Sequence, residues 1–448
     1  MLTGWCGTLL CTLVLAFIGD HCDVTTWIGL GVVTQAFLML ADVPADGYSV
    51  ELGQLENPEE RGMILSTGQR IRFTATMFAG LIQALMVNGT STNATGCPIS
   101  ALNCWSWGLT VGQYYSLISA LLCVIIIPIF FMREISSRHV PIHTLAQHGV
   151  ELWHTLKNPT TMYLLFFVAG NGTLSQLTPM TYNYMQYTLI KLTNFQGGIQ
   201  AIVTYLAVVM GIKVFQTYFI QSNWRFTLYL SIGLSNILGL LWLLVYWNVG
   251  GLLNPWFTIF ITVNQALAQG VSQVLFSMAV IELAKRGQEA ITYELIVSVA
   301  NSASTGMTIL STQLLSPLKA VTCTQSTVDD ATAGACTADE VNVFSEQTFR
   351  DTNGPEKFTV YSLVILGISL AALLFFTRFL PRQKFECAEW KMLGETGKFW
   401  LTPNTVGGIS AIIASTIVLY QIVSSVALLN PSTSCLAMFG GSGCSSSS

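Results

Sequence analysis

Charged residues are scarce in this sequence. They make up 9% of the 448 residues, whereas soluble domains carry about 25%. Hydrophobic residues reach 52%, and the mean hydropathy is +0.57. This composition excludes a typical soluble domain and indicates an integral membrane protein. Because the net charge is -4 and no basic patch occurs, nothing indicates a nucleic-acid partner.

Common catalytic and metal-binding signatures are absent as well. The sequence contains no HExxH, no GxSxG and no CxxC pair. An intramembrane enzyme is therefore the least favoured class, and we expect no cofactor and no metal site. His139 and His143 have helical spacing, but a solvated linker helix is favoured over a metal site there.

Long apolar runs supply what the charges do not. A helix needs about 20 residues to cross a bilayer, and eleven runs approach or exceed this length. They lie near residues 2–19, 24–41, 71–88, 112–132, 161–180, 198–219, 226–247, 255–281, 292–315, 358–380 and 406–429. The sequence therefore predicts an all-α membrane protein with about eleven spans.

The basic residues predict the orientation of these spans. If the turn after residue 41 is cytoplasmic, most of the 19 basic residues fall on that side, as the positive-inside rule requires. No Lys or Arg precedes Arg61, so the opening run is interpreted as a retained span and not as a signal peptide. We expect a multi-pass protein of the plasma membrane rather than of an organelle.

The cysteines give an independent indication of the same orientation. Most of them fall in the external segments, where disulfides persist. The close pairs Cys97 with Cys104, Cys323 with Cys336, and Cys435 with Cys444 are disulfide candidates, although spacing alone does not fix the connectivity. Asn88 and Asn93 lie in external sequons and are glycosylation candidates.

Residues 40–72 form the most polar connection in the first half of the chain. A spacing of four places Asp42 and Asp46 on one helix face, and Glu51 follows them. Arg70 and Arg72 mark the return into apolar sequence. We therefore expect a cytoplasmic elbow at this point, with the two aspartates at the end of a span.

A second acid-bearing turn suggests an internal repeat. Glu282, Glu289 and Glu294 lie in and around the turn between the runs 255–281 and 292–315, and six predicted spans separate them from the first elbow. This period is typical of major facilitator transporters, whose two halves pack around a site near the middle of the membrane. The predicted organisation is therefore two half-bundles with a connector and a C-terminal extension. The predicted segments are residues 1–132 (an incomplete half-bundle), 133–160 (a cytoplasmic connector), 161–380 (the second half-bundle), 381–405 (a cytoplasmic segment), 406–429 (an extra span) and 430–448 (an external tail).

These two motifs resemble the signatures of folate-biopterin transporters, the pteridine carriers of the major facilitator superfamily. Asp42, Val43, Asp46 and Glu51 match the DV-x-x-D-x-x-x-x-E pattern, and Glu282, Gly287, Glu289, Ala290, Ser298 and Asn301 match the second-half signature. The resemblance implies a major facilitator bundle that moves folate- or pterin-like solutes, with protons as coupling ions. It also implies that the family's first two helices would precede residue 1. Pro44 and Gly47 depart from the family pattern and argue against a regular helix across the two aspartates.

The candidate transport residues have competing interpretations. For Asp42 and Asp46, pairing with Arg70 or Arg72 in a gate or scaffold is favoured over proton binding. Glu282, Glu289 and Glu294 are treated in the same way. Gln265, Gln269 and Gln273 share one helix face and would line a wet cavity or join helices by hydrogen bonds. For Asn301, helix packing is favoured.

Two further candidates lie inside predicted spans. Asn171 and Gln176 precede Pro179, so a broken helix is expected there as a substrate surface. Lys213 would neutralise an anionic solute or, more simply, extend to the membrane interface. Two alternatives to a pteridine carrier stay open: a carrier of another small solute (nucleoside, sugar or amino acid) and a truncated remnant that does not transport.

Overall fold

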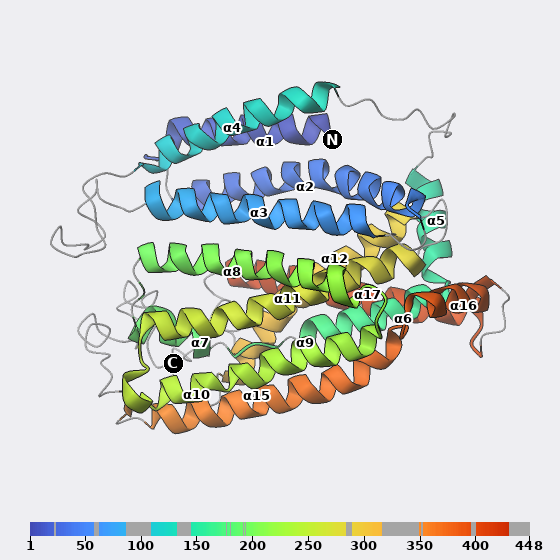
Figure 1. The fold of residues 1–448 in the computed structure, drawn as a ribbon. Coiled ribbons are helices and arrows are strands. Elements are labelled where there is room, and N and C mark those ends of the chain that lie inside the picture. The colour runs from blue at the N-terminus through green and yellow to red at the C-terminus, as the bar shows by residue number, and fades with distance from the viewer. Residues whose placement is uncertain are drawn as a thin grey trace, which may run out of the picture. The chain divides into compact units, whose positions relative to one another are not determined.

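The computed structural model describes residues 1–21, 24–57, 62–86, 109–131, 145–175, 177–179, 181–190, 192, 194–283, 289–315, 349–350, 353–395 and 400–429. All regular secondary structure within these ranges is helical (Figure 1). Each of the eleven predicted runs contains a helix. Seven of the described helices are long and apolar enough to cross a membrane, and Leu2–Ile18 is a shorter apolar helix. The predicted all-α membrane protein is confirmed.

The described chain divides into two compact units. Unit 1 contains residues 1–152, 193–205 and 286–294, and unit 2 contains residues 153–192, 206–285 and 295–448. Three helices, α5 (Leu145–Leu156), α8 (Asn194–Val214) and α12 (Glu289–Leu315), therefore contribute residues to both units.

Unit 1 is built around four helices, α1 (Leu2–Ile18), α2 (Val24–Leu55), α3 (Met63–Met86) and α4 (Val111–Phe131). Helix α1 packs against α2 and α4, and α2 packs against α3. The α1–α2 contact is close because Gly4 has no side chain: a Cβ atom there would lie 2.5 Å from the backbone nitrogen of Ala41. Small residues permit such approaches between membrane helices, where packing replaces the hydrophobic effect.

The elbow after the first acid pair differs from the prediction. Helix α2 continues through Pro44 to Leu55, so the expected turn at the aspartates is wrong, and Asp42 and Asp46 lie inside a candidate span, residues 26–53. Proline removes one helical hydrogen bond, but membrane helices tolerate this loss. The helix reverses only after Leu55, where the Glu56 carboxylate accepts hydrogen bonds from the Gly62 and Ile64 amides at 2.6 and 2.7 Å and so caps α3.

Unit 2 contains the rest of the described helices. They are α6 (Pro159–Gly170), η1 (Asn171–Ser175), α7 (Thr181–Tyr184), η2 (Met185–Leu189), η3 (Phe215–Phe219), α9 (Trp224–Gly239), α10 (Leu241–Tyr246), η4 (Val249–Gly251), α11 (Pro255–Leu283), α15 (Gly354–Phe376), η7 (Thr377–Phe379), α16 (Lys384–Glu395) and α17 (Pro403–Leu429). Helix α5 (Leu145–Leu156) runs from unit 1 into unit 2.

Glycines bring α8 and α11 together within unit 2. A Cβ atom at Gly211 would lie 2.3 Å from the Leu267 carbonyl oxygen, and one at Gly270 would lie 2.2 Å from the Val208 carbonyl oxygen. The two backbones therefore cross almost in contact. Helix α11 also packs on α9 and α16 and is the most deeply buried candidate span.

An aromatic core lies at another part of unit 2. The rings of Tyr182 and Trp242 stack with centroids 4.5 Å apart, and Tyr246 packs edge-on against Phe358 at 5.5 Å. The Tyr246 hydroxyl shares hydrogen bonds with Thr181 at 2.7 Å and with Ser362 at 3.0 Å. These contacts tie α7, α10 and α15 together.

Candidate functional site

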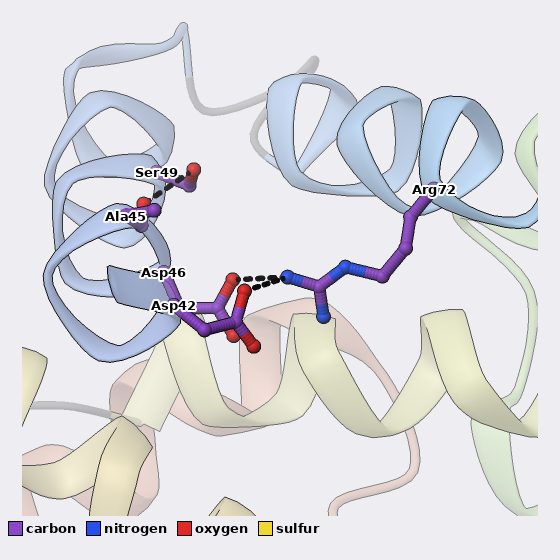
Figure 2. Close-up of polar contacts among 5 residues, drawn as sticks. All are labelled: Asp42, Ala45, Asp46, Ser49 and Arg72. Carbon is purple, nitrogen blue, oxygen red and sulfur yellow. Dashed lines mark hydrogen bonds and ion pairs between the residues drawn. The ribbon is translucent and has the colours of Figure 1, made fainter. Parts of the chain in front are cut away.

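Arg72 joins the two aspartates of the first motif within unit 1 (Figure 2). Its Nη2 atom donates to Asp42 Oδ1 at 2.7 Å and to Asp46 Oδ1 at 3.0 Å. The four-residue spacing places both carboxylates on the face of α2 that meets α3. One guanidinium nitrogen therefore bridges two acids between neighbouring helices. This is the pairing that the sequence proposed for Arg70 or Arg72, and Arg72 makes it.

The two aspartates differ in how deeply they are buried. The side chain of Asp46 is only 15% exposed, whereas those of Asp42 and Arg72 are 42% and 44% exposed. A charge-assisted hydrogen bond contributes more where water is excluded. The Arg72–Asp46 contact is therefore the stronger half of the bridge.

Glu294 brings the second motif to the same place. It lies in the part of α12 that belongs to unit 1, and it interacts electrostatically with Asp46, Asp42 and Arg72. Its Oε1 atom is buried and has no hydrogen-bond partner among the described residues. We call Asp42, Asp46, Arg72 and Glu294 the acid–arginine cluster. With all four groups ionised, one positive charge faces three negative ones, so the cluster can take up a proton or another cation.

Unit 2 contains the predicted break in a helix. Asn158 caps α6 by accepting a hydrogen bond from the Thr160 amide at 3.1 Å, and α6 then widens into the π turn η1, residues 171–175. Residues 177–179 are not helical, and α7 begins at Thr181. We call α6, η1 and α7 together the broken helix. Its break confirms the expectation drawn from Pro179.

Pro179 interrupts the helical hydrogen bonding, and two serines from other helices bond to carbonyls at the break. In a continuous helix the Ser175 carbonyl would accept from the amide of residue 179, but Pro179 has no N–H. The hydroxyl of Ser369 on α15 donates to that carbonyl instead. On the other side, the Ser311 hydroxyl of α12 donates to the Thr178 carbonyl at 2.7 Å. The break is therefore held by side chains of two further helices.

The serine contacts belong to larger buried networks. The Asn236 amide of α9 donates to Ser369 Oγ at 2.8 Å, and the Tyr361 hydroxyl lies 2.6 Å from Ser311 Oγ. Sequence reasoning missed these residues. The sequence predicts from Pro179 that a nearby carbonyl lacks a backbone donor. The serines that donate to the carbonyls at the break lie more than 130 residues away in the chain.

The remaining predicted site residues are distributed over several helices. Glu51 is exposed on α2, Arg70 is half-buried on α3, Lys213 is exposed on α8, and Asn301 is exposed on α12. On α11, Gln265 and Gln273 are half-buried, Gln269 is exposed and Glu282 is buried. Glu289 begins α12. Several predicted residues lie outside the described part of the chain: Gln176, Cys97, Cys104, Cys323, Cys336, Cys435, Cys444, Asn88 and Asn93.

Comparison with known proteins agrees with the resemblance seen in the motifs. The model of the BT1 family matches residues 133–337, which include Asn171, Glu282, Glu289 and Glu294 but not the first motif. The match agrees with the resemblance to folate-biopterin transporters over residues 133–337. The match also supports membrane transport as the general function.

Two other comparisons add less. No curated protein matches the chain. Among solved structures, the chain is similar to a bacterial homologue of the human lysosomal transporter Spinster, in an inward-facing and unoccupied conformation. The sequences are 10% identical, the TM-score is 0.49, and the alignment covers 84% of each chain.

Proposed function

We propose that this protein carries folate- or biopterin-like pteridines across a membrane by alternating access, with protons as the coupling ion. The match of residues 133–337 to the BT1 family supports the substrate class. The acid–arginine cluster supports the coupling, and it is the observation on which the mechanism depends. Its acids come from α2 and α12, and its arginine comes from α3.

Protonation of the cluster changes the contact between its helices. When Asp46 is ionised, Arg72 holds α2 against α3 through a partly buried charged hydrogen bond. A protonated Asp46 loses the Coulomb attraction, and Arg72 keeps only its more exposed contact with Asp42. Binding and release of a proton would therefore strengthen and weaken one inter-helix bridge, as a two-state carrier requires.

Uptake by reconstituted vesicles tests this proposal. The parent protein and Asp46→Asn are compared with labelled biopterin or folate, with and without an inward proton gradient. Ser49→Ala is the matched control, because Ser49 lies one turn further along α2 and its hydroxyl donates only within the helix, to the Ala45 carbonyl at 2.9 Å (Figure 2). We expect the gradient to accelerate uptake by the parent and by Ser49→Ala but not by Asp46→Asn.

Two outcomes would contradict separate parts of the proposal. Gradient-driven uptake by Asp46→Asn at the parent rate would remove Asp46 from coupling. Failure of the parent to take up any pteridine would reject the substrate class. A competition panel of nucleosides, sugars and amino acids in the same vesicles then identifies a different small solute.

A further inference from the structure

Two buried polar atoms on the π turn have no hydrogen-bond partner among the described residues. They are Oδ1 of Asn171 and Oγ of Ser175. Asn171 is 6% exposed and Ser175 is fully buried. Leaving such an atom unsatisfied is energetically costly, so each one calls for an explanation such as an ordered water, an ion or a functional role.

The two atoms are placed to act together. A spacing of four residues brings them to the same side of the turn. The residue between them provides a contrast, because the Thr173 hydroxyl donates to the Ala169 carbonyl at 2.6 Å and is satisfied within the helix. Turns of π-helix are found frequently at functional sites.

Contacts from other helices hold the π turn in place. Ser369 holds the Ser175 carbonyl and is itself held by Asn236. On another side of the turn, a Cβ atom at Gly172 would lie only 3.0 Å from Ala303 Cβ of α12, so that helix packs directly against it. The unsatisfied atoms are therefore fixed features of unit 2.

We propose that Asn171 and Ser175 form a hydrogen-bonding subsite for the donor and acceptor edge of the transported pteridine. An asparagine Oδ1 accepts an N–H group, and a serine hydroxyl both donates and accepts. The pteridine ring offers amino, ring N–H and carbonyl groups side by side, which match this pair. The inference rests on the proposed function, because it names where that solute is held.

Loss of one hydrogen bond predicts the size of the effect. A neutral hydrogen bond contributes about 0.5–1.5 kcal/mol, which corresponds to about a 2- to 10-fold change in affinity. Asn171→Ala and Ser175→Ala should each raise KM for pterin by that factor. Ser175→Thr keeps the hydroxyl and should restore most of the affinity. Thr173→Val, whose hydroxyl is used within the helix, should leave KM unchanged.

Thermal unfolding of the purified full-length protein, with and without biopterin, separates binding from a structural role. Because the alanine variants remove atoms that lack partners, we expect their stability without ligand to be no lower than that of the parent. Their stabilisation by biopterin should be smaller, since ligand stabilisation follows affinity. Ser175→Ala removes a single oxygen and therefore keeps the test valid if Asn171→Ala does not fold.

Three results would overturn the inference. Unchanged KM and unchanged stabilisation by biopterin in both alanine variants would show that the pair does not touch the solute. Lower stability without ligand together with unchanged pterin affinity would show that the two atoms hold only a structural water. A parent protein that neither binds nor transports pterin would overturn the proposed function and the subsite together. If the parent binds pterin, the results for the variants test the subsite alone.

Discussion

Arg72 should couple unequally to its two aspartates, and the inequality can be calculated from burial. Asp46 is 15% exposed, so its charged hydrogen bond to Arg72 should contribute about 1.5–3 kcal/mol. Asp42 is 42% exposed, and exposed ion pairs contribute about 0.2–1 kcal/mol. Arg72→Ala should therefore lower the free energy of unfolding by about 2–4 kcal/mol, mainly because Asp46 loses its partner.

Double-mutant cycles measure the two couplings separately. Arg72→Ala is combined with Asp46→Asn and, independently, with Asp42→Asn, and the free energy of unfolding is measured by denaturant titration in lipid micelles. We expect a coupling energy above about 1.5 kcal/mol for Asp46 and below about 1 kcal/mol for Asp42. Because one nitrogen makes both contacts, Arg72→Lys should keep part of the stability, unlike a bidentate pair.

Salt provides the control for this experiment. Raising the ionic strength should weaken the Asp42 coupling more than the Asp46 coupling, because salt screens exposed charges more strongly than partly buried ones. Equal couplings for the two acids, or no coupling for Asp46, would refute the reasoning from burial.

Three other predictions concern stability. The pKa of Asp20 is lowered by hydrogen bonds from the Gly112 amide and the Thr110 hydroxyl, so the ionised carboxylate stabilises the fold above the ordinary pKa of 3.8 and loses this effect as the pH falls through the lowered pKa. The melting temperatures of the parent and Asp20→Asn should therefore differ near neutral pH and converge in acid. A difference that does not depend on pH would show that the carboxylate does not stabilise the fold through these hydrogen bonds. Ser369→Ala leaves the Ser175 carbonyl without a donor and should lower the free energy of unfolding by about 1–3 kcal/mol in a denaturant titration, and an unchanged value would show that the break does not need this serine. Gly270→Ala places a Cβ atom against the backbone of α8 and should lower the free energy of unfolding by about 1–3 kcal/mol. Gly233→Ala, which has open space around its Cβ atom, should leave the stability unchanged or raise it. Equal melting temperatures for the two variants would contradict the close crossing of α8 and α11.

Local signals were sufficient for the helices and for much of the first motif. The four-residue spacing of Asp42 and Asp46 indicated a shared face, and Arg72 meets that face. The same signals failed at Pro44. The departure from the family pattern there predicts an interrupted helix, whereas helix α2 continues through Pro44 to Leu55. The proline's cost is confined to one turn and is tolerated in membrane helices, and α2 is supported by packing against α1 and α3.

The second motif shows what sequence comparison adds to spacing. The sequence singles out Glu294 because it lies in a turn equivalent to that of Asp46, and nothing in the local sequence places the two residues together. The structure brings Glu294 within electrostatic range of Asp42, Asp46 and Arg72. Such an interaction joins residues about 250 positions apart in the sequence, and only the packing of the helices decides it.

The sequence by itself determined that this chain is a helical membrane protein, because apolar runs of bilayer length leave the backbone no other way to satisfy its hydrogen bonds. It also determined that a helix breaks before Pro179, because proline has no N–H to offer. Only the tertiary structure decided which residues pair with these polar groups. Ser369 donates to the Ser175 carbonyl, and Arg72 bridges the two aspartates. Asn171 Oδ1 has no hydrogen-bond partner among the described residues. The partners lie far away along the chain, and hydrogen bonds and ion pairs act only over a few ångströms. Their pairing is therefore a property of how the helices pack and not of any one segment.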